Sequence, residues 1–172
     1  MKPAAAESQL IKWVNEQPVI WAAFTLKCPR FRSTERWDRL LKDAFNIIEN
    51  TYVKSPMQQR RKNNEEPLLR RVVHLGGDSD NGIAIHAQGL VELIDDDMDR
   101  LQQKMTKSWF TAVRSNERFL PKSNVPLAQD AKVWVQRYES HDGYLQYLNR
   151  FEGSNLGFGV NKVVWSATSL KA

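Results

Sequence analysis

The sequence predicts an α+β fold in which helices pack against an antiparallel sheet of about five strands, after an N-terminal helical extension. Three observations predict this class. Short apolar, β-branched runs alternate with segments of helical periodicity. Two adjacent strand-like runs are joined by turn residues, as in a hairpin. The chain has 172 residues, 41% of them hydrophobic, which is enough for the core of a single domain spanning residues 1–172.

The first elements are a short helix and a buried strand. Residues 6–16 have helical periodicity within an N-terminal extension of residues 1–18. After Pro18, residues 19–26 form a short apolar run that is partly β-branched or aromatic, which predicts a buried strand.

A helix is expected next, with Ser33 or Thr34 as its N-cap. Its apolar residues recur at helical spacing until the pattern fades near Tyr52. Residues 54–67 are then polar and basic, and we expect them to form a mobile surface loop.

The next two strands are expected at residues 68–75 and 83–93. The segment between them, residues 76–82, consists of Gly, Asp, Ser and Asn, which is typical of a turn. The remaining elements follow in chain order: a helix over 95–113, a strand over 132–138, a short helix over 142–151 and a last strand over 160–167.

His86 and Gln88 stand two residues apart in the second hairpin strand. Side chains alternate along a strand, so both point to one face, while Ile85 and Ala87 point to the other. A neutral imidazole nitrogen and an amide oxygen can each ligate a divalent cation. The pair therefore predicts part of a metal site, with an ordinary hydrogen-bonded histidine as the alternative.

The hairpin suggests a third ligand. If its turn centres near residues 79–80, the residue opposite His86 is Val73 or His74. Two imidazoles suit Mn²⁺ or another transition metal better than Mg²⁺. The predicted ligands are therefore the imidazoles of His74 and His86 and the side-chain amide of Gln88. The carboxylates of Asp78 and Glu92 are alternative ligands.

Tyr144, Tyr147 and Arg150 are spaced three residues apart, so they lie near one side of the predicted short helix. A tyrosine hydroxyl can act as a covalent nucleophile when a nearby metal and a cation stabilise the developing charge. The alternative is that both tyrosines pack with their hydroxyls at the surface.

Three short segments resemble, in the same order, motifs of the HUH-type endonuclease domain of rolling-circle replication initiators, a family found in circular single-stranded-DNA viruses and many plasmids. The first motif, a strand followed by proline, is resembled by Phe24-Thr25-Leu26-Lys27-Cys28-Pro29. The HUQ variant of the metal motif is resembled by His86-Ala87-Gln88-Gly89. The tyrosine motif is resembled by Tyr147-Leu148-Asn149-Arg150. The resemblance covers roughly residues 19–167 and implies an RRM-like sheet.

The resemblance also implies an activity. The chain would be a metal-dependent, site-specific single-strand DNA endonuclease and strand transferase that forms a covalent 5′-phosphotyrosine. Tyr147 would be the nucleophile. Tyr144 would be a candidate for a second nucleophile. Arg150, which stands where the family usually has lysine, would stabilise phosphate charge, and the cofactor would be Mn²⁺ or Mg²⁺.

Charge and composition fit a nucleic-acid partner. The formal charge is +5 and the pI is near 9.4. Five basic residues near the hairpin would hold a DNA backbone: Arg60, Arg61, Lys62, Arg70 and Arg71. The expected partner is a single-stranded or hairpin origin. A separate helicase is also expected, because the chain has no GxxxxGK[ST] phosphate-binding loop.

Other classes are disfavoured. No apolar run approaches the roughly 20 residues that span a bilayer, and no signal peptide is expected. The lone Cys28 excludes a disulfide within the chain and a cysteine-rich zinc site. We expect a cytoplasmic location in a bacterial host, or the replication compartment of a virus-infected cell. The alternatives are a non-catalytic RRM-like nucleic-acid-binding domain, a relaxase-type or transposase-type HUH nuclease, and a scaffold without a nucleic-acid role.

Overall fold

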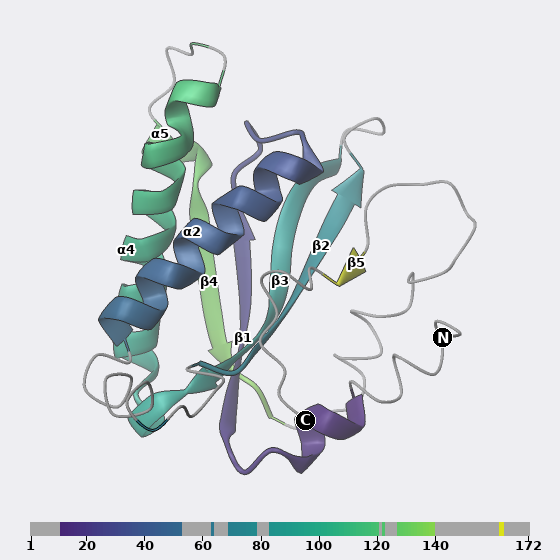
Figure 1. Cartoon of the computed structure of the whole chain (residues 1–172), viewed down its shortest axis with the longest axis vertical. Coiled ribbons are helices and arrows are strands. Elements are labelled where there is room, and N and C mark those ends of the chain that lie inside the picture. The colour runs from purple at the N-terminus through teal and green to yellow at the C-terminus, as the bar shows by residue number, and fades with distance from the viewer. Residues whose placement is uncertain are drawn as a thin grey trace.

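The structure is a computed structural model, and it describes residues 11–52, 63, 69–78, 83–120, 122, 127–139 and 162–163. Its described elements form an α+β arrangement in which the two long helices lie across one face of an antiparallel sheet (Figure 1). This confirms the coarse fold class predicted from the sequence.

The sheet has the strand order β4-β1-β3-β2-β5, and every neighbouring pair is antiparallel. The fifth strand is a two-residue segment at the edge beside β2. The bounds are β1 Ile20–Lys27, β2 Arg71–Asp78, β3 Ile83–Leu93, β4 Lys132–Arg137 and β5 Lys162–Val163.

Two long helices pack on the sheet and on each other. Their bounds, with those of the shorter helical segments, are α2 Thr34–Tyr52, η1 Ile94–Asp96, α4 Met98–Asn116, η2 Glu117–Phe119 and α5 Leu127–Asp130. Residues 11–16 are also helical. None of the described helices is long and apolar enough to cross a membrane.

The helix α4 begins later than the sequence pattern predicted. Asp95 and Asp96 have positive φ angles of 59° and 55°, and they belong to the 3₁₀ turn η1. Aspartate tolerates this left-handed conformation better than most residues, but a residue in it cannot continue an α-helix. Asp97 then acts as the N-cap, because its carboxylate accepts a hydrogen bond from the Arg100 backbone N–H at 2.9 Å.

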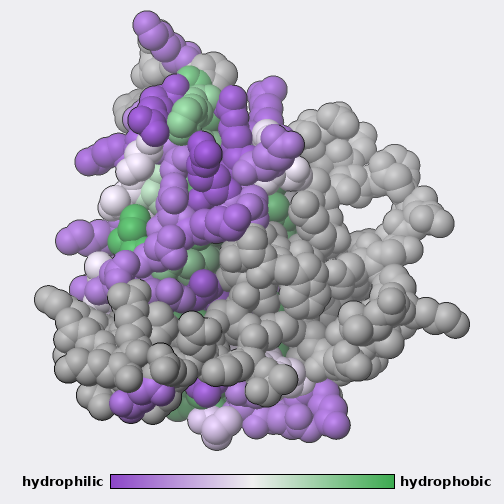
Figure 2. Space-filling model, viewed as in Figure 1, coloured by the Kyte–Doolittle hydropathy of each residue, from purple (hydrophilic) through white to green (hydrophobic). Residues whose placement is uncertain are grey.

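The main core lies between the helices and the sheet. Trp37 of α2 stacks on Trp109 of α4 with ring centroids 5.4 Å apart, and both indoles are fully buried. The Trp37 indole N–H donates to the carbonyl of Phe31 at 2.8 Å, so its polar atom is satisfied. Hydrophilic residues cover the outward faces of the helices (Figure 2), as expected for amphipathic helices on a core.

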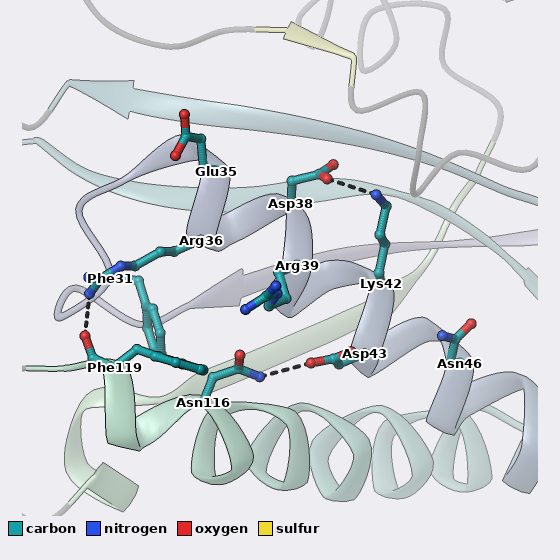
Figure 3. A pocket seen from close by; sticks show the side chains of 10 residues that line it. All are labelled: Phe31, Glu35, Arg36, Asp38, Arg39, Lys42, Asp43, Asn46, Asn116 and Phe119. Atoms are coloured by element: carbon teal, nitrogen blue, oxygen red, sulfur yellow. Dashed lines mark hydrogen bonds and ion pairs between the residues drawn. The ribbon is translucent and has the colours of Figure 1, made fainter.

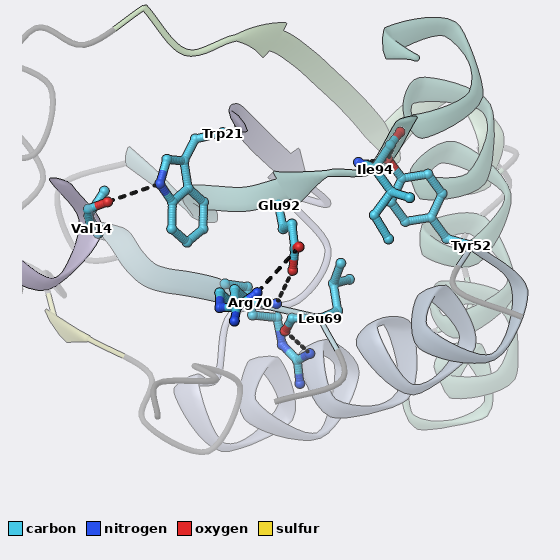
Figure 4. Close-up of polar contacts among 8 residues, drawn as sticks. Val14, Trp21, Tyr52, Leu69, Arg70, Glu92 and Ile94 are labelled. Atoms are coloured by element: carbon cyan, nitrogen blue, oxygen red, sulfur yellow. Dashed lines mark hydrogen bonds and ion pairs between the residues drawn. The ribbon is translucent and has the colours of Figure 1, made fainter. Parts of the chain in front are cut away.

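A second, smaller cluster covers part of the other sheet face. Val14 packs there against Trp21, Ala23, Val72 and Leu90. The Trp21 indole N–H donates to the Val14 carbonyl at 3.1 Å (Figure 4). The helical residues 11–16 are therefore attached to the sheet by both apolar contact and a hydrogen bond.

The predicted strand at 83–93 is confirmed at its full length, and the hairpin of β2 with β3 is confirmed by their pairing. The expected helix over 142–151 lies outside the described residues. So does the basic loop over 54–67, apart from Asn63. Of the last predicted strand, the structure describes Lys162–Val163.

Candidate functional site

His74, His86 and Gln88 all point to the sheet face that the long helices leave uncovered. Their strand neighbours Leu75 and Ala87 belong to the core on the helix side, and side chains alternate along a strand. The structure therefore places the three predicted metal ligands on one face of the β2–β3 hairpin.

The register differs from the sequence expectation by about two residues. His74 lies opposite Gln88, and the partner of His86 is Gly76. A register shift between Gly76 and Asp78 marks an irregularity at the end of β2, which residue counting across a turn does not reveal. The predicted direct pairing of His74 with His86 is wrong, and the two histidines are diagonal neighbours.

His86 is oriented by a backbone contact. Its Nδ1 lies 3.1 Å from the carbonyl oxygen of Ala84, which places the proton on Nδ1 and leaves a lone pair on Nε2. That Nε2 lies 3.1 Å from the point that a Cβ would occupy at Gly76, and the Gln88 side-chain nitrogen lies 3.6 Å from the same point. The imidazole and the amide thus converge over a residue without a side chain.

His74 is buried, with 1% of its surface exposed. Neither of its ring nitrogens has a hydrogen-bond partner among the described residues. Burial lowers the pKa of His74 from 6.5 to about 4, so the ring is neutral at physiological pH. An unpaired buried polar group of this kind is uncommon in native structures and suggests a functional role.

The side chains of His74, His86 and Gln88 could bind a divalent cation only together with further ligands. No group of three or more His, Cys, Asp or Glu side chains that could hold a metal occurs among the described residues. The chain would supply two imidazole nitrogens and an amide oxygen, and the remaining positions would be open to water or to a phosphate oxygen.

Of the two alternative carboxylate ligands, the described Glu92 is engaged within the protein, and the Cys28 thiol is also unsuited to binding a metal. The Glu92 carboxylate is buried and accepts hydrogen bonds from the backbone and the side chain of Arg70 at 3.2 and 3.4 Å (Figure 4). Burial raises the pKa of the Cys28 thiol to about 11, which keeps this side chain protonated. The side chain of Asp78 lies outside the described residues.

The two described basic residues from the predicted DNA-binding set are engaged within the protein. Arg70 pairs with Glu92. Arg71 points to the helix side, where it is 9% exposed, pairs with Glu49 and lies 4.8 Å from the ring centroid of Phe45. The prediction that Arg71 holds a DNA backbone does not agree with this buried position.

Other predicted site residues lie outside the described part of the chain, so their positions stay predictions. They are the tyrosine and arginine residues of the expected short helix and three basic residues of the expected loop: Tyr144, Tyr147, Arg150, Arg60, Arg61 and Lys62.

Sequence reasoning missed Gly76 as part of this site. A glycine in a strand often marks a place where another group approaches the backbone closely, and that signal was present two residues after His74. Here the approaching group is the His86 imidazole.

A separate pocket of about 650 Å³ lies on the helix side, between α2 and the end of α4 (Figure 3). Some of its polar side chains contact one another. Lys42 is 3.0 Å from Asp38, and the Asn116 amide donates to Asp43 at 2.9 Å. This pocket contains none of the predicted site residues.

No known protein-family model, curated protein or solved structure matches this chain. The fold and the site therefore define an α+β protein with an imidazole–amide cluster on the sheet face opposite the two long helices.

Proposed function

We propose that this protein is a metal-dependent, site-specific single-strand DNA endonuclease and strand transferase with an RRM-like sheet. It would belong to the HUQ variant of the HUH-type rolling-circle replication initiators. The proposal is supported by the strand order β4-β1-β3-β2 and by the sequence motifs that resemble this family.

One observation carries the proposal: His86 Nε2 and the Gln88 amide converge over Gly76, beside a buried, neutral His74 that has no hydrogen-bond partner among the described residues. A structural histidine would normally have a hydrogen-bond partner. Two imidazoles that each present a ring nitrogen without a partner among the described residues are better suited to binding Mn²⁺ or Mg²⁺, with Mn²⁺ favoured by nitrogen ligands.

The proposed reaction is a transesterification. The Tyr147 oxygen attacks the scissile phosphorus, a Tyr–O–P bond forms and the P–O3′ bond breaks. The tyrosine proton is transferred in net terms to the leaving 3′ oxygen, giving a 3′-hydroxyl and a 5′-phosphotyrosine. A divalent ion, held by His74, His86 and Gln88, would polarise the scissile phosphate. The reverse reaction joins a 3′-hydroxyl to the phosphotyrosine end.

The other predicted residues have supporting roles in this proposal. Arg150 stabilises charge on the phosphate. Tyr144 is the alternative nucleophile. Arg60, Arg61 and Lys62 hold the DNA backbone, a separate helicase supplies unwinding, and the reaction takes place wherever the host replicates the element.

The test is covalent capture on DNA. The protein is incubated with Mn²⁺ and with single-stranded oligonucleotides tiled across the replicon that encodes it, and adducts are detected on denaturing gels. We expect one adduct-forming sequence, lost with Tyr147→Phe and retained with Tyr144→Phe. Adduct formation by Tyr147→Phe would show that the nucleophile is another residue.

The metal site is tested by Mn²⁺ titration followed by electron paramagnetic resonance. We expect His86→Ala to lose Mn²⁺ binding and cleavage while retaining DNA binding. Parallel loss of DNA binding and cleavage, with Mn²⁺ binding unchanged, would contradict the ligand assignment.

A second candidate function is a non-catalytic nucleic-acid-binding domain of RRM-like topology. The exposed Trp134 on β4 favours it, because exposed aromatics on a sheet can stack on bases. Binding of single strands without adduct formation on any sequence would support this function. A relaxase or transposase role would instead appear as strand transfer between ends of a mobile element.

A further inference from the structure

The exposed Trp134 lies on the same sheet face as the imidazole–amide cluster. Its cross-strand partner is Thr25, whose other partner is Gln88, and Gln88 is in turn paired with His74. Directly paired residues point to the same face, so the four side chains form one row across four strands. At the usual strand spacing, Trp134 lies two strands, or roughly 10 Å, from Gln88.

Trp134 is the most exposed large hydrophobic residue that the structure describes, at 48%. The Val133 and Val135 side chains on either side of it pack against the core. The strand is therefore anchored by its neighbours, while the indole itself contributes its face to the surface.

The adjacent row contains two lysines. Lys27 of β1 is paired with Lys132 of β4, and the other partner of Lys27 is His86. Both lysines are exposed, and neither forms an ion pair with any residue in the described ranges. Like charges directly opposite each other destabilise a sheet, so this pair is favourable when an anion lies between the two ammonium groups.

No exposed acidic side chain described on these strands is available on this face to pair with Lys27 or Lys132. Among described strand residues on this face with described side chains, Glu92 is the acidic one, and it is buried against Arg70. Residues 11–16 cover the far end of the face, over Trp21 and Leu90. The open part is thus a positively charged surface with one exposed indole.

We propose that Trp134, Lys27 and Lys132 form a binding subsite for single-stranded nucleic acid. One unpaired base stacks on the Trp134 indole, and an adjoining phosphate lies between the two lysines. Stacking requires an unpaired base, and the lysines require an anion, so a single strand satisfies both. The role of this subsite in leading the strand towards His86 depends on the proposed function, whereas the binding itself does not.

The test is fluorescence anisotropy with a labelled oligothymidylate. We expect Trp134→Ala to weaken binding by roughly 5-fold to 150-fold, which is the range for loss of one stacked base. Trp134→Phe should keep part of the affinity. The matched control is Ile20→Ala, because Ile20 is also an exposed apolar residue of the sheet, at 41%, but on the helix side. Equal affinities of the Trp134→Ala and Ile20→Ala variants would overturn the subsite.

The lysines are tested by salt dependence. The double variant Lys27→Gln/Lys132→Gln should reduce the slope of log affinity against log salt by about 0.7, the value for one phosphate contact on a single strand, and each single variant should reduce it by part of that amount. The control is Lys107→Gln, on the exposed side of α4. Unchanged slopes for both sheet variants would contradict the phosphate contact.

The subsite and the proposed function fail in different ways. If no adduct forms on any DNA but Trp134→Ala still weakens binding, the endonuclease proposal fails and the subsite stands. If adducts form and Trp134→Ala binds and cleaves as the unmodified protein does, the subsite fails and the endonuclease proposal stands.

Discussion

The Nε2 atom of His86 lies directly over Gly76, 3.1 Å from the point that a Cβ atom would occupy there. This distance is shorter than ordinary van der Waals contact, so a methyl group at this position must displace the imidazole. The displaced atom is Nε2. Nε2 is also the ring nitrogen available to a ligand, because Nδ1 contacts the Ala84 carbonyl.

Gly76→Ala is therefore expected to weaken Mn²⁺ binding by roughly 10-fold or more, as displacement of a supporting group does in other metal sites. The measurement is Mn²⁺ titration by electron paramagnetic resonance. The thermal unfolding midpoint should change little, since no positive φ is required at this glycine. Unchanged Mn²⁺ affinity would mean that His86 Nε2 is not a ligand.

His74→Leu is expected to stabilise the metal-free protein by about 1–3 kcal/mol, the usual cost of a buried polar group without a partner. His74 is such a group among the described residues. The measurement is urea unfolding in the presence of a chelator, and the same variant should lose Mn²⁺ binding. A less stable variant would indicate that the imidazole makes a favourable contact in the folded protein.

Glu49→Ala and Arg71→Ala should each lower the free energy of unfolding by about 1–3 kcal/mol, because each removes one side of an ion pair whose side chains are only 11% and 14% exposed. The measurement is chemical unfolding, with DNA binding recorded where both variants remain folded. We expect both to bind DNA normally there. Loss of DNA affinity by folded Arg71→Ala, with Glu49→Ala unaffected, would restore Arg71 to the DNA-binding set.

Cys28 should be unreactive in the native protein. Burial raises the pKa of its thiol from 9.0 to about 11, so its thiolate fraction at pH 8 is very small. A thiol-specific reagent should therefore react with the unfolded chain and not with the folded one. Rapid native labelling at pH 8 would contradict the buried position.

The same shift predicts how stability depends on pH. The folded-state pKa is raised, so the stabilising contribution of this thiol is complete below pH 9 and is lost as the pH rises from 9 to about 11. Cys28→Ala should reduce the slope of unfolding free energy against pH in that interval. An unchanged slope would show that the thiol does not titrate differently in the two states.

The sequence patterns were most informative where one face of an element is buried. The alternation in residues 83–93 predicted β3 with its observed bounds. The same alternation could have placed Arg71 with Val73 on the helix side, but its charge suggested a surface role instead. Charge alone does not show whether a long side chain is paired within the protein.

Other features depend on contacts that no sequence pattern encodes. The pairing of His86 with Gly76 depends on the irregularity between Gly76 and Asp78. The lack of a hydrogen-bond partner for His74 among the described residues depends on what packs around it in three dimensions. The presence of an imidazole–amide cluster was therefore predictable, whereas its internal geometry was not.

The contact of Trp13 with Trp21, with ring centroids 5.8 Å apart, has a practical consequence for shortened forms of the protein. A truncated protein that begins at β1 would lose the helical residues that cover Trp21, Val72 and Leu90. These apolar side chains of the sheet would then be exposed to solvent. They would adjoin the lysine and tryptophan surface, and they would draw apolar molecules and other copies of the chain to them. Removal of the N-terminal residues would thus create a non-specific apolar binding surface next to the lysine and tryptophan surface.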